Sequence, residues 1–166
     1  MIRKGYHTQE HRTKSLIEPI QCLKGNAWLG AAYYFWIEED DALFWGDVAK
    51  RSTGKYDVYC CEIDCENILD TVFNEEHYSF WLKNIEKVAK KFVKSTGSKP
   101  TIKEINEYFL ENKVWESLDG IMFQDISKNA VHFIVKEFQY KKRIQIALYN
   151  KDKLTKFAHH FTGDCN

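Results

Sequence analysis

The feature that most constrains the fold is a pair of helices predicted in the middle of the chain. Apolar side chains recur at intervals of three and four over residues 75–95, which is the spacing of one helical face. Asn74 precedes this stretch and suits a helix N-cap. A Ser-Thr-Gly-Ser-Lys-Pro run then breaks the pattern, and Thr101 with Glu104 forms a capping-box signature before a second apolar stripe. We therefore expect a helical pair over about 75–114.

Runs that favour β-strands flank this helical pair on both sides. They cover residues 2–7, 56–63, 121–126, 130–138 and 143–149. A sheet must therefore combine strands from both ends of the chain, and two shorter helices are expected at 13–20 and 42–49. The chain has 166 residues, of which 44% are hydrophobic, which is enough for one packed core. We expect a single α+β domain spanning residues 1–166.

Composition argues against several classes of function. Lys and Arg total 24, as do Asp and Glu, so no overall electrostatic field directs the protein toward nucleic acid or an anionic membrane. No apolar run approaches the ~18 residues that a membrane-spanning helix needs, and the N-terminal residues do not form a signal peptide. The five cysteines make an odd count, which suits a reducing compartment. We expect a cytoplasmic protein without a membrane partner.

The spacing of histidines and cysteines predicts no metal centre. His7 and His11 stand four residues apart, but His7 follows a strand-like run and no third ligand is evident nearby. Cys60, Cys61 and Cys65 lack the Cys-x-x-Cys spacing of zinc or redox sites. We interpret these three cysteines as buried structural thiols.

Two further polar clusters have a simple surface interpretation. Lys141-Lys142-Arg143 is more typical of solvated charge at a hairpin than of a phosphate-contacting patch. His159-His160 is most simply interpreted as part of the surface.

Three polar segments on β-favouring stretches remain, and together they form a recognisable pattern. They are Tyr-His-Thr at 6–8, Leu-Gly-Ala-Ala-Tyr-Tyr-Phe-Trp at 29–36 and Arg-Ile-Gln-Ile-Ala-Leu-Tyr-Asn at 143–150. This pattern resembles the His-Tyr-Glu class of ADP-ribosyltransferases, the PARP-like group. The motifs of that group are Tyr-His-Gly-Ser/Thr, then Leu-Gly-x-Gly-x-Tyr-Phe followed by an acidic residue and Ala-x-x-Trp/Tyr, and finally Glu-Ile-x-x-Tyr-Asn. The resemblance extends from residue 6 to about 154 and includes the Asp-Ala-Leu-Phe-Trp run at 41–45.

The resemblance implies NAD⁺ as substrate and a catalytic trio of His7, Tyr34 and Gln145. In the family, the His donates to the ribose on the adenosine side, the Tyr stacks on nicotinamide, and the third residue holds the nicotinamide ribose. The residues implied in NAD⁺ binding are His7, Thr8, Gln9, Gly30, Ala32 and Tyr34. Small residues before the Tyr would let the backbone approach the nicotinamide ring closely.

The chain departs from the family pattern at three places. Thr8-Gln9 stands where the family has Gly-Ser/Thr, and Ala32 replaces the second Gly of the Tyr motif. Gln145 replaces the family Glu and removes its charge, which in such relatives accompanies transfer of a single unit, altered acceptor choice or lost activity. The implied fold is a split antiparallel β-sandwich of two facing sheets with flanking helices, in which the trio converges on one cleft and the helical pair is an insert.

Two functions follow from the resemblance. The first is a mono-ADP-ribosyltransferase that modifies a protein or nucleic acid, as a bacterial or phage-related toxin or effector does, with an antitoxin as a further expected partner. The second is a catalytically degenerate module that binds a nucleotide or a partner protein, with the helical pair as the recognition element. The simplest alternative to both makes Tyr34 and Trp36 core aromatics and His7 a buried histidine with satisfied hydrogen bonds.

Overall fold

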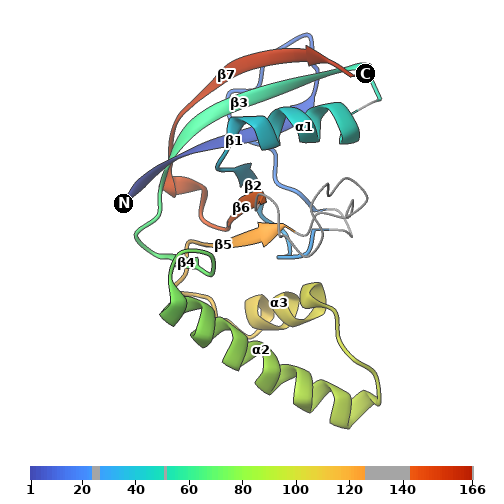
Figure 1. The fold of residues 1–166 in the computed structure, drawn as a ribbon, viewed down its shortest axis with the longest axis vertical. Helices are drawn as coiled ribbons and strands as arrows, with labels where there is room; N and C mark the ends of the chain where they lie inside the picture. The colour runs from blue at the N-terminus through green and yellow to red at the C-terminus, as the bar shows by residue number, and fades with distance from the viewer. Residues whose placement is uncertain (24–26, 51, 126–142, 166) are drawn as a thin grey trace, which may run out of the picture.

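The strands form one hydrogen-bonded sheet. The computed structural model describes residues 1–23, 27–50, 52–125 and 143–165. Within these ranges the sheet has seven strands in the order β4-β5-β6-β2-β1-β3-β7, accompanied by three α-helices (Figure 1). The strands are β1 (Ile2–Glu10), β2 (Tyr33–Trp36), β3 (Lys55–Asp64), β4 (Ile68–Asp70), β5 (Gly120–Asp125), β6 (Arg143–Leu148) and β7 (Leu154–Asp164). The helices are α1 (Glu39–Ala49), α2 (Glu75–Thr96) and α3 (Ile102–Glu111), with a short 3₁₀ helix, η2 (Lys151–Lys153).

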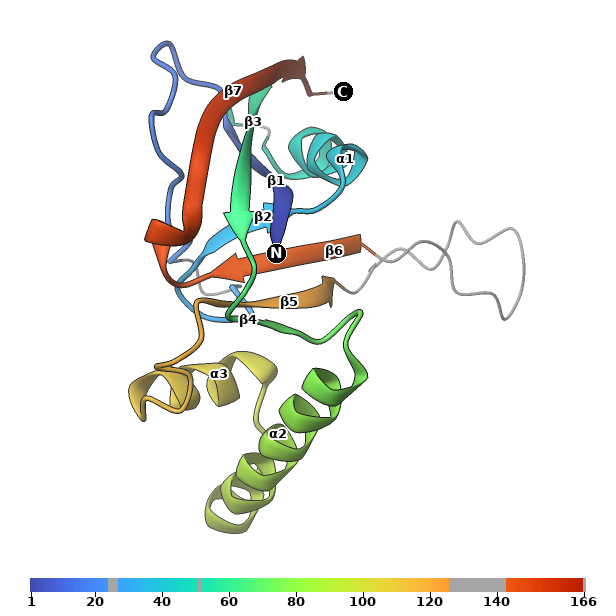
Figure 2. The ribbon, with the colours of Figure 1, turned by 90° about the vertical axis from the view of Figure 1, so that its left-hand side faces the viewer.

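The sheet has two halves that cross steeply. We call β1, β3 and β7 the upper half-sheet, and β4, β5, β6 and β2 the lower half-sheet. β1 pairs with β3 along its whole length, but it meets β2 at one register pair, Tyr6 opposite Trp36. Figure 2 shows β3 and β7 running across the direction of β5 and β6. The predicted α+β class is confirmed, with a sheet that is antiparallel except for the β4–β5 pair. The resemblance implied two facing sheets, but the strands instead form one continuous sheet that is joined at this crossing.

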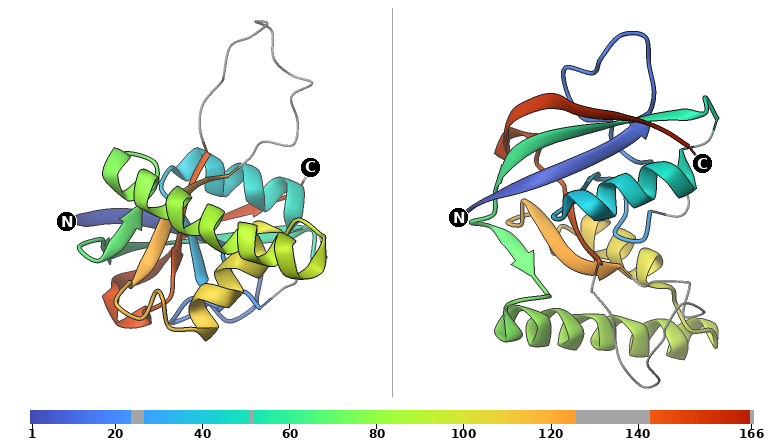
Figure 3. Two further views of the ribbon diagram at one scale, coloured as in Figure 1. Left: turned by 90° about the horizontal axis from the view of Figure 1, so that it is seen from below. Right: turned by 45° about the horizontal axis from the view of Figure 1, so that its top comes forward.

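The helices cover different halves of the sheet. α1 packs on β1 and β3, whereas α2 and α3 lie below the lower half-sheet (Figures 1 and 3). Three buried apolar clusters result. The α3 cluster consists of Leu29, Ala32, Leu69, Ile105, Phe109, Trp115, Ile121, Phe123 and Ala147. The central cluster consists of Phe35, Cys61, Ile63, Cys65, Ile68, Met122, Ile144, Ile146 and Leu148. The α1 cluster consists of Tyr6, Trp36, Ala42, Tyr56 and Val58.

The predicted helical pair is confirmed, together with its caps. The Asn74 side chain accepts a hydrogen bond from the His77 backbone N–H at 3.1 Å, at the start of α2. Gly97 ends α2 with a positive φ of 74°, a conformation that glycine adopts without strain. Thr101 and Glu104 form both halves of the expected capping box before α3. The helix predicted at 42–49 is also present, as α1.

Other expectations for secondary structure differ from the fold. The helix predicted at 13–20 is wrong: these residues are irregular, and Pro19 both lacks a backbone N–H and disfavours helix in the preceding residue. β7 was not predicted, because its side chains are largely exposed on both faces and show little alternation. Pairing with β3 determines this strand. The strand predicted at 130–138 lies outside the described residues.

Candidate functional site

His7 is buried, and both nitrogens of its ring have protein partners. Its exposed fraction is 3%. Nδ1 lies 2.9 Å from the backbone oxygen of Tyr34, which can only accept, so Nδ1 carries the proton. Nε2 accepts from the side-chain amide of Gln9 at 2.9 Å and from the backbone N–H of Ile20 at 3.3 Å. Burial lowers the pKa of His7 to about 4, although the bond to Tyr34 opposes this shift. The ring is therefore neutral at pH 7 and has no nitrogen left for a ribose hydroxyl.

A segment that we call the strap, residues 12–22, covers the face of the upper half-sheet that carries His7. Three of its backbone N–H groups, spaced four residues apart, donate to side chains of that face. The bonds are Arg12 N to Asp57 Oδ2 (3.2 Å), Leu16 N to Tyr59 Oη (3.1 Å) and Ile20 N to His7 Nε2 (3.3 Å). The far end is held by Cys22, whose N–H donates to the Ala32 oxygen at 2.8 Å. A ligand that reached His7 would first have to displace the strap.

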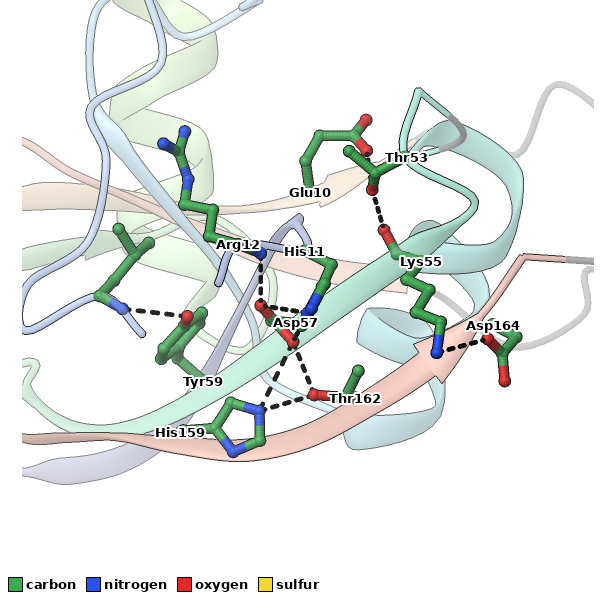
Figure 4. A network of polar contacts seen from close by, with 11 residues as sticks. Glu10, His11, Arg12, Thr53, Lys55, Asp57, Tyr59, His159, Thr162 and Asp164 are labelled. Atoms are coloured by element: carbon green, nitrogen blue, oxygen red, sulfur yellow. Dashed lines mark hydrogen bonds and ion pairs between the residues drawn. The ribbon is translucent and has the colours of Figure 1, made fainter. Parts of the chain in front are cut away.

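Asp57 anchors the first end of the strap. Its side chain is 2% exposed and accepts from His11 Nδ1 at 3.0 Å, from the Arg12 N–H at 3.2 Å and from Thr162 Oγ1 at 2.6 Å (Figure 4). His159 Nε2 lies 3.6 Å from the same carboxylate. Burial raises the pKa of Asp57, but the hydrogen bonds outweigh burial and lower it overall. This network joins the ends of β1, β3 and β7. Sequence reasoning missed it, although an aspartate inside an otherwise apolar β run was its visible signal.

Tyr34 is a half-buried side chain that closes a local turn. Its hydroxyl accepts from the Leu29 N–H at 3.2 Å and donates to the Gly30 oxygen at 2.9 Å. Its ring packs against the α3 cluster. Burial raises the pKa of Tyr34 above its usual range, although the bond from Leu29 opposes the shift. The hydroxyl of Tyr149 binds the same turn by donating to the Leu29 oxygen at 3.0 Å.

Gln145 lies on the same face of the lower half-sheet as Tyr34. It stands opposite Trp36 on β2 and opposite Phe123 on β5, and side chains in opposite register share a face. Tyr34 stands opposite Ala147, two residues from Gln145, which places Tyr34 on that face as well.

His7 lies on the other face. Its ring centroid is 5.4 Å from that of Phe35, which follows Tyr34 on β2 and points the opposite way. Phe35 belongs to the central cluster, whereas Tyr34 packs on the α3 cluster. The structure thus brings Tyr34 and Gln145 to one face and does not bring His7 to them. The expected convergence of the trio on one cleft is not what the fold produces.

The other residues implied in NAD⁺ binding also form hydrogen bonds or packing contacts within the protein. Thr8 is buried against α1, where its hydroxyl donates to the Ala42 oxygen at 2.9 Å. The side-chain amide of Gln9 donates a hydrogen bond to His7 Nε2. Gly30 has a positive φ of 81° in the turn that Tyr34 closes, and Ala32 is fully buried in the α3 cluster. The small residues before Tyr34 are explained by this turn and its contacts.

A separate candidate surface lies between α2 and α3, in the predicted recognition element. A cavity of about 750 Å³ opens beside the C-terminal half of α2 and the start of α3. Its apolar lining residues are Ile85, Ala89, Val93, Pro100, Ile102 and Ile105, and its charged lining residues are Glu86, Lys90, Lys94 and Lys99. We call this cavity the helical groove. It combines an apolar lining with a small set of charged groups, as sites for partners commonly do.

The described residues also bear on the metal, cysteine and membrane expectations. Within ranges 1–23, 27–50, 52–125 and 143–165, no group of three His, Cys, Asp or Glu side chains is arranged to hold a metal ion. The prediction of buried thiols is confirmed for Cys61 and Cys65, and burial raises the pKa of both, whereas Cys60 is a free thiol that is only half-buried. Among the described helices, none is long and apolar enough to cross a bilayer.

Comparison of the chain with protein families, with curated proteins and with solved structures finds no match.

Proposed function

We propose that this chain is a partner-binding module that has an ADP-ribosyltransferase-like arrangement of strands but does not turn over NAD⁺. The observation that carries the proposal is the position of His7, which packs on Phe35 while Tyr34 and Gln145 occupy the opposite face. This is the degenerate alternative of the two functions that the sequence suggests.

The geometry supports this function because cleavage of NAD⁺ depends on positioning. The reaction passes through an oxocarbenium-like ribose, so its catalytic groups must surround one ligand. His7 has both nitrogens occupied and lies beneath the strap, and the hydroxyl of Tyr34 is bound within its own turn. Neither group is presented to a ligand. Gln145, moreover, lacks the charge that would attract the developing cation.

The helical groove supports binding of a partner. α2 has 22 residues, none of which is buried, although one face is apolar. Trp81 and Val88 of that face pack on the α3 cluster. Ile85 and Ala89 contact the cluster and also line the helical groove, and Val93 lines the groove beyond them. An exposed apolar groove of this kind is typical of an interaction site.

The competing function is mono-ADP-ribosyl transfer, and the shared face of Tyr34 and Gln145 favours it. The two functions are separated by incubating the purified chain with labelled NAD⁺ and a cell lysate. Free nicotinamide and label transferred to protein or nucleic acid are then measured. We expect neither above the level of a buffer control, for the wild type and for Gln145→Ala alike.

Turnover by the wild type above the buffer control would overturn the proposal. If Gln145 takes part in that turnover, the rate should fall by about 30-fold or more in Gln145→Ala, which is the loss of one transition-state contact of about 2 kcal/mol. Thermal unfolding of both proteins serves as the control. A drop in activity at an unchanged melting temperature would place Gln145 in an active site.

A further inference from the structure

We infer that the helical groove binds an acidic amphipathic helix of a partner protein. The inference rests on the proposed partner-binding function and names the chemistry of the partner. The groove lies on α2 and α3, away from His7, Tyr34 and Gln145.

The shape of the groove favours a helix as its occupant. Ile85, Ala89 and Val93 follow one another at intervals of four on α2, and Ile102 lies opposite them at the start of α3, whereas Ile105 also lines the groove but is buried in the α3 cluster. A row at intervals of four is a ridge beside which side chains of a packing helix insert. The row on α2 spans about 12 Å at 1.5 Å per residue, which corresponds to about two helical turns of a partner.

The apolar groups of the groove determine the face that the partner must present. Val93 is 40% exposed although it is a large aliphatic residue, and no residue of α2 is buried. A third helix with aliphatic side chains at positions i, i+3, i+4 and i+7 would remove this surface from water. Recognition of a helix in a groove commonly uses this spacing of anchors.

The charges around the groove determine the sign of the charge that the partner must carry. Three lysines line it, against one glutamate. Lys90 pairs with Glu86 at 3.7 Å, and in the described part of the chain neither Lys94 nor Lys99 forms an ion pair. Because the chain as a whole is neutral, this excess of positive charge is local. Carboxylates that flank the aliphatic face of the partner would complement Lys94 and Lys99.

The experiment uses the full chain and a display library of random peptides of about 14 residues, long enough to span the groove. We expect the selected peptides to carry aliphatic residues at helical spacing with Asp or Glu beside them. Affinity of the best peptide is then measured by fluorescence anisotropy for three proteins. Lys94→Glu/Lys99→Glu should weaken it by about tenfold or more relative to wild type, since it replaces two attractions by repulsions. Lys91→Glu should change it less than about twofold, because Lys91 is exposed on the same helix but does not line the groove.

Several results would overturn the inference. They are a library that yields no binders, selected peptides that are basic or uncharged, and equal weakening by Lys91→Glu and the double variant. A further arm uses vesicles of phosphatidylserine and phosphatidylcholine. Vesicle binding that the double variant abolishes, without any acidic peptide, would assign the groove to an anionic membrane surface. The nicotinamide assay is independent: turnover there refutes the proposed function, whereas absence of acidic peptides refutes this inference alone.

Discussion

Replacing Asp57 by Ala should destabilise the protein far more than replacing an exposed aspartate. Asp57 is the acceptor that joins the strap, β3 and β7, through bonds from His11, from the Arg12 N–H and from Thr162. Ala would leave these donors without the buried carboxylate that accepts from them. The effect is a direct measure of how firmly the start of the strap is held.

The magnitude follows from the exposure of the groups involved. Hydrogen bonds to a charged acceptor contribute about 1.5 to 3 kcal/mol each, and they are not additive. His11 is 37% exposed on its side chain, so after the change it can bind water and the loss there is small. We therefore expect Asp57→Ala to cost about 2 to 4 kcal/mol of unfolding free energy at pH 7.

The effect should depend on pH in a defined direction. The pKa of Asp57 is lower in the folded protein than its usual value of 3.8. A carboxyl of lowered pKa contributes its full stability above the unfolded pKa and loses it as pH falls through the folded pKa. The difference between wild type and Asp57→Ala should therefore be largest above about pH 5 and should shrink toward pH 3.

Urea unfolding followed by the fluorescence of the five tryptophans measures these differences at each pH. The matched control is Asp164→Ala, whose side chain is 79% exposed and pairs with Lys55 at 3.4 Å. This control should cost less than about 0.5 kcal/mol. A cost for Asp57→Ala no greater than that of the control, or a difference that stays constant down to pH 3, would refute the reasoning.

Three further predictions concern the strap, His7 and the packing of α1. Tyr59→Phe removes the acceptor of the Leu16 N–H and should lower the unfolding free energy by about 1 to 2 kcal/mol. Trypsin should then cleave inside the strap faster than in the wild type, and an unchanged cleavage rate would contradict this prediction. Acidification from pH 7 to 4 should lower the unfolding free energy of the wild type by about 3 kcal/mol more than that of His7→Gln. The reason is that burial lowers the pKa of His7 to about 4, so His7 takes up a proton on unfolding. Equal losses for the two proteins in urea titrations would exclude this coupling. Gly46→Ala should lower the unfolding free energy by about 1 to 3 kcal/mol despite the better helix propensity of Ala. The reason is that a β-carbon there would lie 2.2 Å from Tyr56 Cδ2. A melting temperature at or above that of the wild type would disprove this clash.

The candidate site was only partly accessible from the sequence. The resemblance places His7 on a strand and Tyr34 in the next one, and both lie in strands, β1 and β2. Alternation along β2 correctly separates Tyr34 from its neighbours, since residues next to each other on a strand face opposite sides. It does not determine which of those sides faces His7. That depends on the crossing of β1 over β2 at Tyr6 and Trp36.

The sequence by itself determined the local elements of this protein. α2 and α3 follow from apolar spacing and from caps formed within a few residues of each other, and the long alternating run predicts β3. Such signals persist in any context because they depend on neighbours along the chain.

Only the tertiary structure decided the strap, β7 and the state of His7. The three bonds from the strap to Asp57, Tyr59 and His7 join residues 13 to 45 positions apart. Residues 13–20 have a helical apolar spacing that these bonds and Pro19 override. β7 exists because β3 offers it a free edge. His7 is neutral and satisfied because the fold places the Tyr34 oxygen, Gln9 and Ile20 around it. Backbone groups carry no residue-specific signal, so contacts made through them over long separations cannot be predicted from residue types.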